Sequence, residues 1–144
     1  VHTLHNATDT ERFDPDRSAG SGAAVRERYG IPADAPLLGI VARINPWKGQ
    51  RETIAALGML SARHPQMRLM VVGAGPADEE EAVRRAASEA GVAERVVFAG
   101  RHPDVRPFLD AFDLFVHPSF EEPFGLAITE AMAMRKPVIA CDSG

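Results

Sequence analysis

The alternation of short apolar runs with helical patterns predicts an α/β fold, a Rossmann-like three-layer sandwich built on a mostly parallel sheet. Unbroken apolar runs such as Leu37–Val41 and Leu69–Val72 are typical of strands buried on both faces. Helical patterns follow these runs, as in a chain that returns across a sheet by helices. With 144 residues, 45% of them hydrophobic, the chain suffices for one domain over residues 1–144 with a single core.

The N-terminal segment carries the weakest pattern. Val1–Leu4 is apolar enough for a strand, whereas Asn6–Ser21 is polar and contains Pro15, which favours a loop. A short helix is expected at Ala23–Tyr29, with Gly30 as its stop.

Five strands and four helices are expected beyond that point. Ile54, Leu57 and Leu60 recur every three residues and predict one apolar helix face. A second, highly charged helix is expected at 78–90, and Gly91 marks its C-terminal end. The strands are expected at 37–41, 69–72, 96–99, 114–116 and 138–140, and the helices at 50–63, 78–90, 105–111 and 124–134.

Composition excludes several classes of protein. The net charge of −4 argues against a nucleic-acid surface, and no apolar run approaches the ~20 residues that span a bilayer. Cys141 is the one cysteine, so an internal disulfide is impossible and a cytoplasmic location is expected. Cys141 ends an apolar run and is expected to be buried. Because the chain begins at Val1 without methionine and stops directly after a strand, we expect a fragment of a longer protein.

Ligands of such sheets bind beyond the carboxyl ends of the strands, so the residues after each strand are the candidates for a site. One of these turns, Gly73-Ala74-Gly75, resembles the start of a dinucleotide-binding motif. Asp78 stands where that motif needs its third glycine, which disfavours a nicotinamide or flavin cofactor. An approach of this backbone to another ligand stays open.

Arg43 and Lys48 lie between a strand and a helix. A guanidinium binds phosphate oxygens bidentately, an ammonium adds a point charge, and a helix start adds N–H groups, so the pair suits a diphosphate. The pattern is equally compatible with two solvated surface charges.

The segment from Phe120 to Leu126 leads into a helix that carries Glu130. Gly125 permits close approach of a ligand to the backbone, and the Glu130 carboxylate could accept hydrogen bonds from a ribose diol. An exposed acidic loop before an amphipathic helix explains the same residues. His102 and His117 follow strands, but solvated or internally paired histidines are the commoner case, and the five histidines form no metal-ligand pattern.

Several motifs follow one another at characteristic spacing. Two glutamates, Glu122 and Glu130, have seven residues between them. The motifs are Asn6–Phe13, Val41-Ala42-Arg43 with Lys48-Gly49, Val72–Pro76, Val97–Gly100, Ser119–Gly125, and Glu130–Ala133 leading to Pro137–Ala140. In this order they resemble the C-terminal, donor-binding domain of family 4 retaining glycosyltransferases, which form one half of the GT-B fold.

The resemblance implies a hexosyltransferase that uses a nucleotide diphosphate sugar and needs neither metal nor cofactor. It implies that the acceptor domain and the extreme C-terminal helices are missing, that the fragment alone transfers no sugar, and that any membrane association comes through the missing domain. The implied catalytic residues are Arg43 and Lys48 on the diphosphate and Glu122 at the sugar. The implied substrate-binding residues are Gly75, Arg101, His102, Phe124, Gly125, Leu126 and Glu130.

Two features depart from the family pattern: Ala7 replaces a usual glycine, and Glu121 precedes Glu122. A non-catalytic nucleotide-binding or interaction module on the same fold is the alternative function. The glutamate pair together with Arg43 and Lys48 disfavours an epimerase or phosphorylase.

Overall fold

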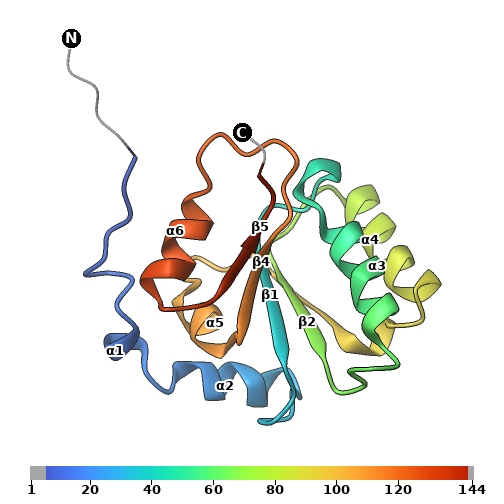
Figure 1. Cartoon of the computed structure of the whole chain (residues 1–144), viewed down its shortest axis with the longest axis horizontal. Helices are drawn as coiled ribbons and strands as arrows, with labels where there is room; N and C mark the ends of the chain where they lie inside the picture. The colour runs from blue at the N-terminus through green and yellow to red at the C-terminus, as the bar shows by residue number, and fades with distance from the viewer. Residues whose placement is uncertain (1–5, 143–144) are drawn as a thin grey trace.

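The computed structural model describes residues 6–142, so the expected strand at Val1–Leu4 lies outside the described residues (Figure 1). Five parallel strands form one sheet in the order β3-β2-β1-β4-β5. The predicted α/β class with a parallel sheet is confirmed. The strands are β1 (Leu37–Val41), β2 (Arg68–Val72), β3 (Val96–Gly100), β4 (Leu114–His117) and β5 (Val138–Ala140). The helices are α1 (Pro15–Ser18), α2 (Ser21–Arg28), α3 (Gln50–Leu60), α4 (Ala77–Glu89), α5 (Arg106–Ala111) and α6 (Leu126–Ala133), with 3-10 turns η1 (Pro46–Lys48) and η2 (Ala93–Arg95).

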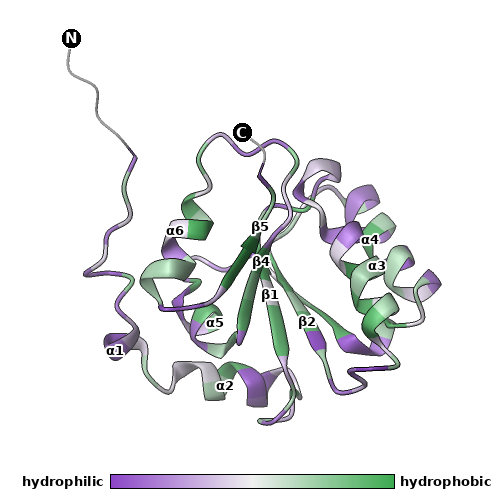
Figure 2. Cartoon of the chain, in the orientation of Figure 1, coloured by the Kyte–Doolittle hydropathy of each residue, from purple (hydrophilic) through white to green (hydrophobic). Residues whose placement is uncertain are grey.

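Helices cover both faces of the sheet. In Figure 1, α3 and α4 lie on one side and α2, α5 and α6 on the other. Two apolar clusters fill the spaces between these layers, and Figure 2 shows the strands as mainly hydrophobic. On β1, Leu37 belongs to one cluster and Ile40 to the other, and both are fully buried. The central strand is therefore apolar throughout because it has no solvent-facing side.

The order in which strands are added to the sheet reverses at the β1–β4 pair. The crossovers through α3 and α4 build outward from β1 to β2 and β3, whereas the next crossover, through α5, returns to place β4 on the other side of β1. Because connections of this kind are right-handed, the reversal moves the helices to the opposite face. The helical connections that follow β1 and β4 therefore lie on opposite faces of the sheet, and the crevice beyond the ends of these two strands is where open α/β sheets bind ligands.

Most element boundaries shift by one or two residues, and three differences from the prediction have an identifiable physical cause. The segment expected to be a loop because of Pro15 contains α1, since Pro15 occupies the first helical turn and the Asp14 side chain accepts a hydrogen bond from the Asp16 N–H. Helix α3 ends at Leu60 rather than 63, just before the proline-linked turn at His64. Helix α6 begins after Gly125, whose left-handed conformation interrupts the helix predicted from 124.

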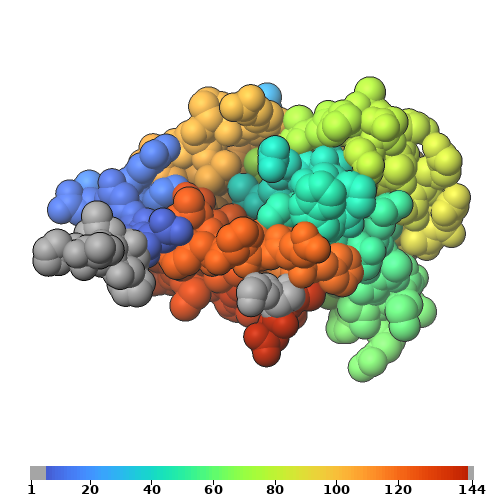
Figure 3. Space-filling view, turned by 90° about the horizontal axis from the view of Figure 1, so that it is seen from above, coloured from blue at the N-terminus to red at the C-terminus, as the bar shows by residue number. Residues whose placement is uncertain are grey.

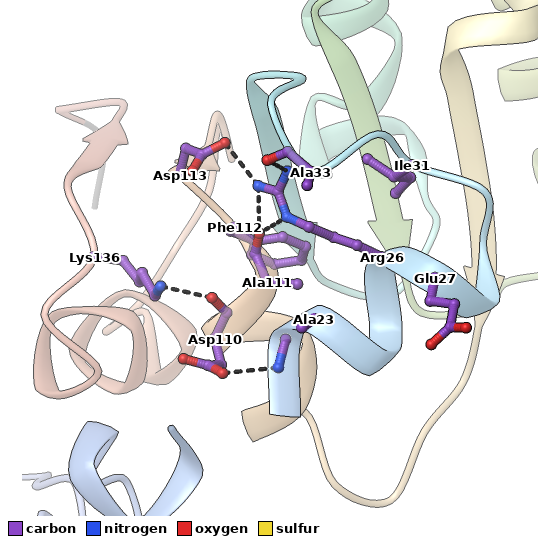
Figure 4. Close-up of a pocket in the computed structure, with 11 residues that line it drawn as sticks. Ala23, Arg26, Glu27, Ile31, Ala33, Asp110, Ala111, Phe112, Asp113 and Lys136 are labelled. Atoms are coloured by element: carbon purple, nitrogen blue, oxygen red, sulfur yellow. Dashed lines mark hydrogen bonds and ion pairs between the residues drawn. The ribbon is translucent and has the colours of Figure 1, made fainter. Parts of the chain in front are cut away.

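A cavity of about 480 Å³, lined by both charged and apolar residues, lies at the amino edge of the sheet, opposite the crevice (Figure 4). Its Arg26 guanidinium donates to the carbonyls of Ala35 and Ala111 and to the Asp113 carboxylate, all within 2.8–3.0 Å. Lys136 Nζ donates to the Asp110 carbonyl at 2.8 Å. Both cations are bonded to the protein's own oxygens: Arg26 joins α2 to the segments before β1 and β4, and Lys136 joins the segment after α6 to α5. We therefore assign this cavity to the architecture of the domain.

The expectation that Cys141 is buried is wrong. Cys141 is exposed, as are its neighbours Ile139 and Ala140. Strand β5 lies at the edge of the sheet, and α6 covers it on one side only, so an apolar run here does not mean burial. In residues 6–142, no helix has the length and apolar character needed to cross a bilayer.

Candidate functional site

The segments leaving the strands are bonded to one another through their backbones. The Phe120 N–H donates to the Trp47 carbonyl at 2.9 Å, which joins the segment after β4 to the segment after β1. Figure 3 looks onto this edge and shows the two segments, orange and teal, side by side. The Ile44 N–H donates to the Ala74 carbonyl at 3.0 Å, which joins β1 to β2 in the same way. The candidate residues thus stand on one connected rim.

The glycine-rich turn after β2 is needed for this close approach. Gly73 has φ +146°, and a Cβ there would lie 1.8 Å from the Ala42 carbonyl oxygen. A Cβ on Gly75 would lie 2.2 Å from the Ile44 carbonyl oxygen. Both glycines are therefore explained by backbone packing against the Arg43 segment, and Gly75 also lines a cavity described below.

A cavity of about 580 Å³, here named the Lys48 cavity, occupies the crevice between β1 and β4. Its lining includes six residues predicted from the sequence, drawn from two segments about 75 positions apart. They are Arg43, Lys48, Glu122, Phe124, Gly125 and Leu126. Arg43 is exposed. The backbone of Arg43 is held by buried Gln50 at the start of α3, which donates its amide N–H to the Arg43 carbonyl at 2.9 Å.

Glu122 is the centre of a compact hydrogen-bonded group in this cavity. Lys48 Nζ lies 2.5 Å and His117 Nε2 lies 2.8 Å from the same oxygen, Oε2. The other oxygen, Oε1, accepts the Gly125 N–H at 3.1 Å. Only 15%, 5% and 17% of the Lys48, His117 and Glu122 side chains is exposed, so the group lies largely out of water. The neighbouring Glu121 is exposed.

These contacts determine the charge of Glu122. Burial opposes ionisation of the carboxyl, but the hydrogen bonds and charges of Lys48 and His117 outweigh it and lower the pKa of Glu122 from 4.5 to about 2. Glu122 is thus a carboxylate at neutral pH, restricted to accepting hydrogen bonds.

Glu122→Gln is expected to destabilise the domain most at neutral pH and progressively less in acid. Since the pKa of Glu122 is lowered on folding, its ionised form adds stability above about pH 4.5, and this contribution is lost as the pH falls towards 2. Urea unfolding of both proteins at about pH 7, 5 and 3.5 measures the difference. Glu121→Gln, the exposed control, should stay within about 0.5 kcal/mol of the unsubstituted protein throughout. A Glu122→Gln difference independent of pH would contradict the assigned ionisation.

The start of α6 also faces the Lys48 cavity. Gly125 has φ +77°, a conformation that suits glycine, and directs the chain into α6 without a side-chain cap from the described residues. Leu126 and Ala127, in the first turn, line the cavity. Backbone N–H groups of a first turn have no acceptor one turn earlier, so this end can bind an anion or a hydroxyl.

A second cavity of about 510 Å³, here named the His102 cavity, adjoins the first. Arg43 lines both cavities, and Gly75, Arg101 and His102 line the second one. His102 Nε2 lies 3.0 Å from the Ala99 carbonyl, and its ring centroid lies 4.3 Å from that of Phe108. The His102 ring is therefore held by its own strand end, whereas Arg101 is exposed.

Glu130 is the predicted site residue that lines neither cavity. It lies three residues after Ala127 on α6, which places both residues on one side of the helix. Burial raises the pKa of Glu130, and the charge of Arg12 partly opposes the shift. The structure thus separates the candidate residues into the Lys48 cavity, the His102 cavity and the adjacent side of α6.

Two further residues of this geometry were not among the predicted site residues, although one follows a strand and the other begins the first of the motifs. His117 ends an apolar strand, where an internally paired or solvated histidine is the expected case; it is 4% exposed and paired with Glu122. Asn6 lines the Lys48 cavity because the N-terminal segment passes α6. In residues 6–142, no three His, Cys, Asp or Glu side chains are grouped so that they could hold a metal ion.

The fold and this site define a class: an α/β domain with a cation-lined crevice at the point where its strand order reverses. Residues 35–144 match the family model described as glycosyl transferases group 1. The chain belongs to this family.

Two curated relatives of the chain are named as sugar transferases. It is 40% identical over 150 residues to the GDP-mannose-dependent alpha-(1-6)-phosphatidylinositol monomannoside mannosyltransferase of Mycolicibacterium smegmatis, covering 98% of the chain and 38% of that protein. It is 36% identical over 142 residues to the 2-deoxystreptamine glucosyltransferase of Streptomyces kanamyceticus, covering 93% of the chain and 36% of that protein. The chain therefore spans little more than a third of these relatives.

Solved structures agree with the fold. Anabaena Alr3699/HepE in complex with UDP-glucose superposes with a TM-score of 0.87 at 32% identity, covering 98% of the chain and 38% of that protein. A glycosyltransferase from Rickettsia africae gives a TM-score of 0.89 at 24% identity, with the same two coverages, and supports the fold alone.

Proposed function

We propose that residues 1–144 form the C-terminal, donor-binding domain of a longer family 4 glycosyltransferase with the GT-B architecture. The longer enzyme transfers a hexosyl group from a nucleotide diphosphate sugar to an acceptor hydroxyl, with retention of configuration and without a metal ion. A separate N-terminal domain holds the acceptor.

One observation carries this proposal: Arg43 lines two adjoining cavities, and Lys48 and the start of α6 line one of them as well. A diphosphate at Arg43 has room for a nucleoside on one side and a sugar on the other. Lys48, Arg43 and the α6 N–H groups provide positive potential where the leaving diphosphate gains negative charge. Such fixed cations supply the stabilisation that a metal ion supplies in other transferases.

The remaining residues take complementary roles in this proposal. Arg101, His102 and Gly75 border the nucleoside, and Glu130 accepts the ribose hydroxyls from the adjacent side of α6. Phe124, Gly125 and Leu126 surround the sugar, with Glu122 against it. Lys48 moves from Glu122 to the phosphate when the donor binds, because an ammonium with three N–H groups can exchange one acceptor for another.

Calorimetry with UDP and GDP in the presence of a chelator tests the proposal. We expect the folded chain to bind at least one of them without added metal, since the cations that contact the phosphates belong to the protein. Two related proteins are named with GDP-mannose and UDP-glucose, so these two donors are the ones to compare next. Failure of a folded sample to bind any common nucleoside diphosphate, including ADP, would refute a donor site in this chain.

A further inference from the structure

His117 stands in an unusual place for a histidine. It is the last residue of β4, beside the central strand, and its side chain is 5% exposed. Its ring lies parallel to that of Phe115, with centroids 6.1 Å apart. An apolar residue would satisfy this packing, whereas a buried imidazole N–H needs an acceptor to offset the loss of water. The acceptor it has is Glu122 Oε2.

Glu122 depends on such a contact because it stands on an irregular segment. Residues 118–125 between β4 and α6 form no helix or strand, so only side-chain and backbone partners fix the carboxylate. Gly125 N–H holds Oε1, and Lys48 and His117 share Oε2. Lys48 is the partner that the proposed diphosphate attracts away. His117 would then be the remaining side-chain donor to Glu122 among the described residues.

We propose that His117 is a positioning residue that holds the Glu122 carboxylate in place against the donor sugar while Lys48 contacts the diphosphate. This role rests on the proposed function of the site. Glu122 is ionised and can only accept, so Nε2 of His117 carries the hydrogen in their contact. Neither the strand pattern nor the glutamate spacing requires a histidine here.

Two substitutions separate this role from packing. His117→Phe keeps an aromatic ring beside Phe115 but removes the donor, and His117→Gln restores an N–H donor without the ring. The readout is the ratio of the Kd of UDP to that of UDP-glucose, and of GDP to GDP-mannose, measured by calorimetry. We expect His117→Phe to reduce this ratio roughly tenfold and His117→Gln to recover most of it. The affinity of His117→Phe for the bare diphosphate should change less than twofold. A general disturbance of the fold would weaken the binding of the bare diphosphate as well.

Glu122→Gln distinguishes the failure of this inference from the failure of the proposed function. If Glu122→Gln lowers the ratio and His117→Phe does not, His117 has no positioning role. If Lys48→Ala and Glu122→Gln both leave all affinities unchanged, the donor site itself is refuted and the inference falls with it. Nitrogen-15 NMR of the His117 imidazole in the unsubstituted chain tests the inference even if the variants fold poorly, because it needs no substitution. We expect a protonated Nε2 both without ligand and with UDP, and an unprotonated Nε2 would overturn the inference.

Discussion

Lys48→Ala is expected to weaken the binding of UDP by about tenfold or more while leaving the binding of uridine almost unchanged. A hydrogen bond to a charged group contributes about 1.5–3 kcal/mol, which corresponds to roughly a tenfold to hundredfold change in Kd. The Lys48 side chain is only 15% exposed, so its charge is weakly screened by solvent. Uridine lacks the phosphates that Lys48 would contact, and its affinity therefore serves as an internal reference.

The chain offers a matched control for this substitution. Lys136 is its other lysine, and it lies at the amino edge of the sheet with Nζ bonded to the Asp110 carbonyl. Lys136→Ala removes the same charge from the domain but from the opposite end, so the affinity for UDP should stay within twofold. Calorimetry in low salt compares all three proteins. Equal losses for uridine and UDP in Lys48→Ala would mean that Lys48 shapes the cavity rather than binding phosphate.

Competition from Glu122 affects the size of this effect. The ion pair with Glu122 must loosen when Lys48 turns to a phosphate, so part of the gain from the phosphate contact offsets the loss of that pair. Glu122→Gln should consequently bind bare UDP at least as tightly as the unsubstituted chain, since it frees Lys48 and removes a nearby negative charge. The same variant should lose any preference of the chain for a nucleotide sugar over the matching bare diphosphate, which distinguishes the proposed sugar role of Glu122 from the proposed phosphate role of Lys48.

Much of the fold follows from local pattern. All five strands predicted between residues 37 and 140 are present. The apolar runs of β1, β2 and β4 are mostly buried, whereas β3 and β5 lie at the edges of the sheet and are more open. The rule that ligands bind beyond the carboxyl ends of strands also points to Arg43, Lys48 and the 118–124 segment from the strand pattern alone. The spacing from Glu130 selects Glu122 rather than Glu121, and the structure places Glu122 in the cavity and Glu121 in solvent.

Other features depend on contacts that no local pattern encodes. The pairing of Lys48 with Glu122 joins residues 74 positions apart, and it requires the segment after β4 to fold back towards β1. The role of His117 depends on the same return of the chain. The exposure of Cys141 depends on which elements pack against the outer side of β5, and the local sequence of β5 does not determine those contacts. Pro15 breaks a helix in some positions and begins one in others, and the deciding contact is the Asp14 cap.

Gly73→Ala is expected to lower the free energy of unfolding by about 3 kcal/mol or more, the largest effect on stability among the substitutions proposed for this chain. A Cβ at this position would lie 1.8 Å from the Ala42 carbonyl oxygen, and the backbone would also have to keep φ at +146°. Movement of either backbone segment would strain a hydrogen bond. The Gly73 N–H donates to the Gly100 carbonyl at 2.8 Å, and the Ala42 N–H donates to the Val72 carbonyl at 3.0 Å.

Gly30→Ala separates backbone strain from the steric clash in this prediction. Gly30 has φ +63°, but a Cβ there would meet nothing within 4 Å, so its cost should be limited to about 1–2 kcal/mol of left-handed strain. Urea unfolding of the three proteins measures the difference, and calorimetry with UDP measures its consequence for the site. Any movement that relieves the clash displaces Ala42 and therefore Arg43, so a folded Gly73→Ala protein should also bind UDP more weakly, whereas Gly30→Ala should bind it normally. A Gly73→Ala protein no less stable than Gly30→Ala would show that the turn after β2 can separate from the Arg43 segment, and that the rim joining the two cavities is not rigid.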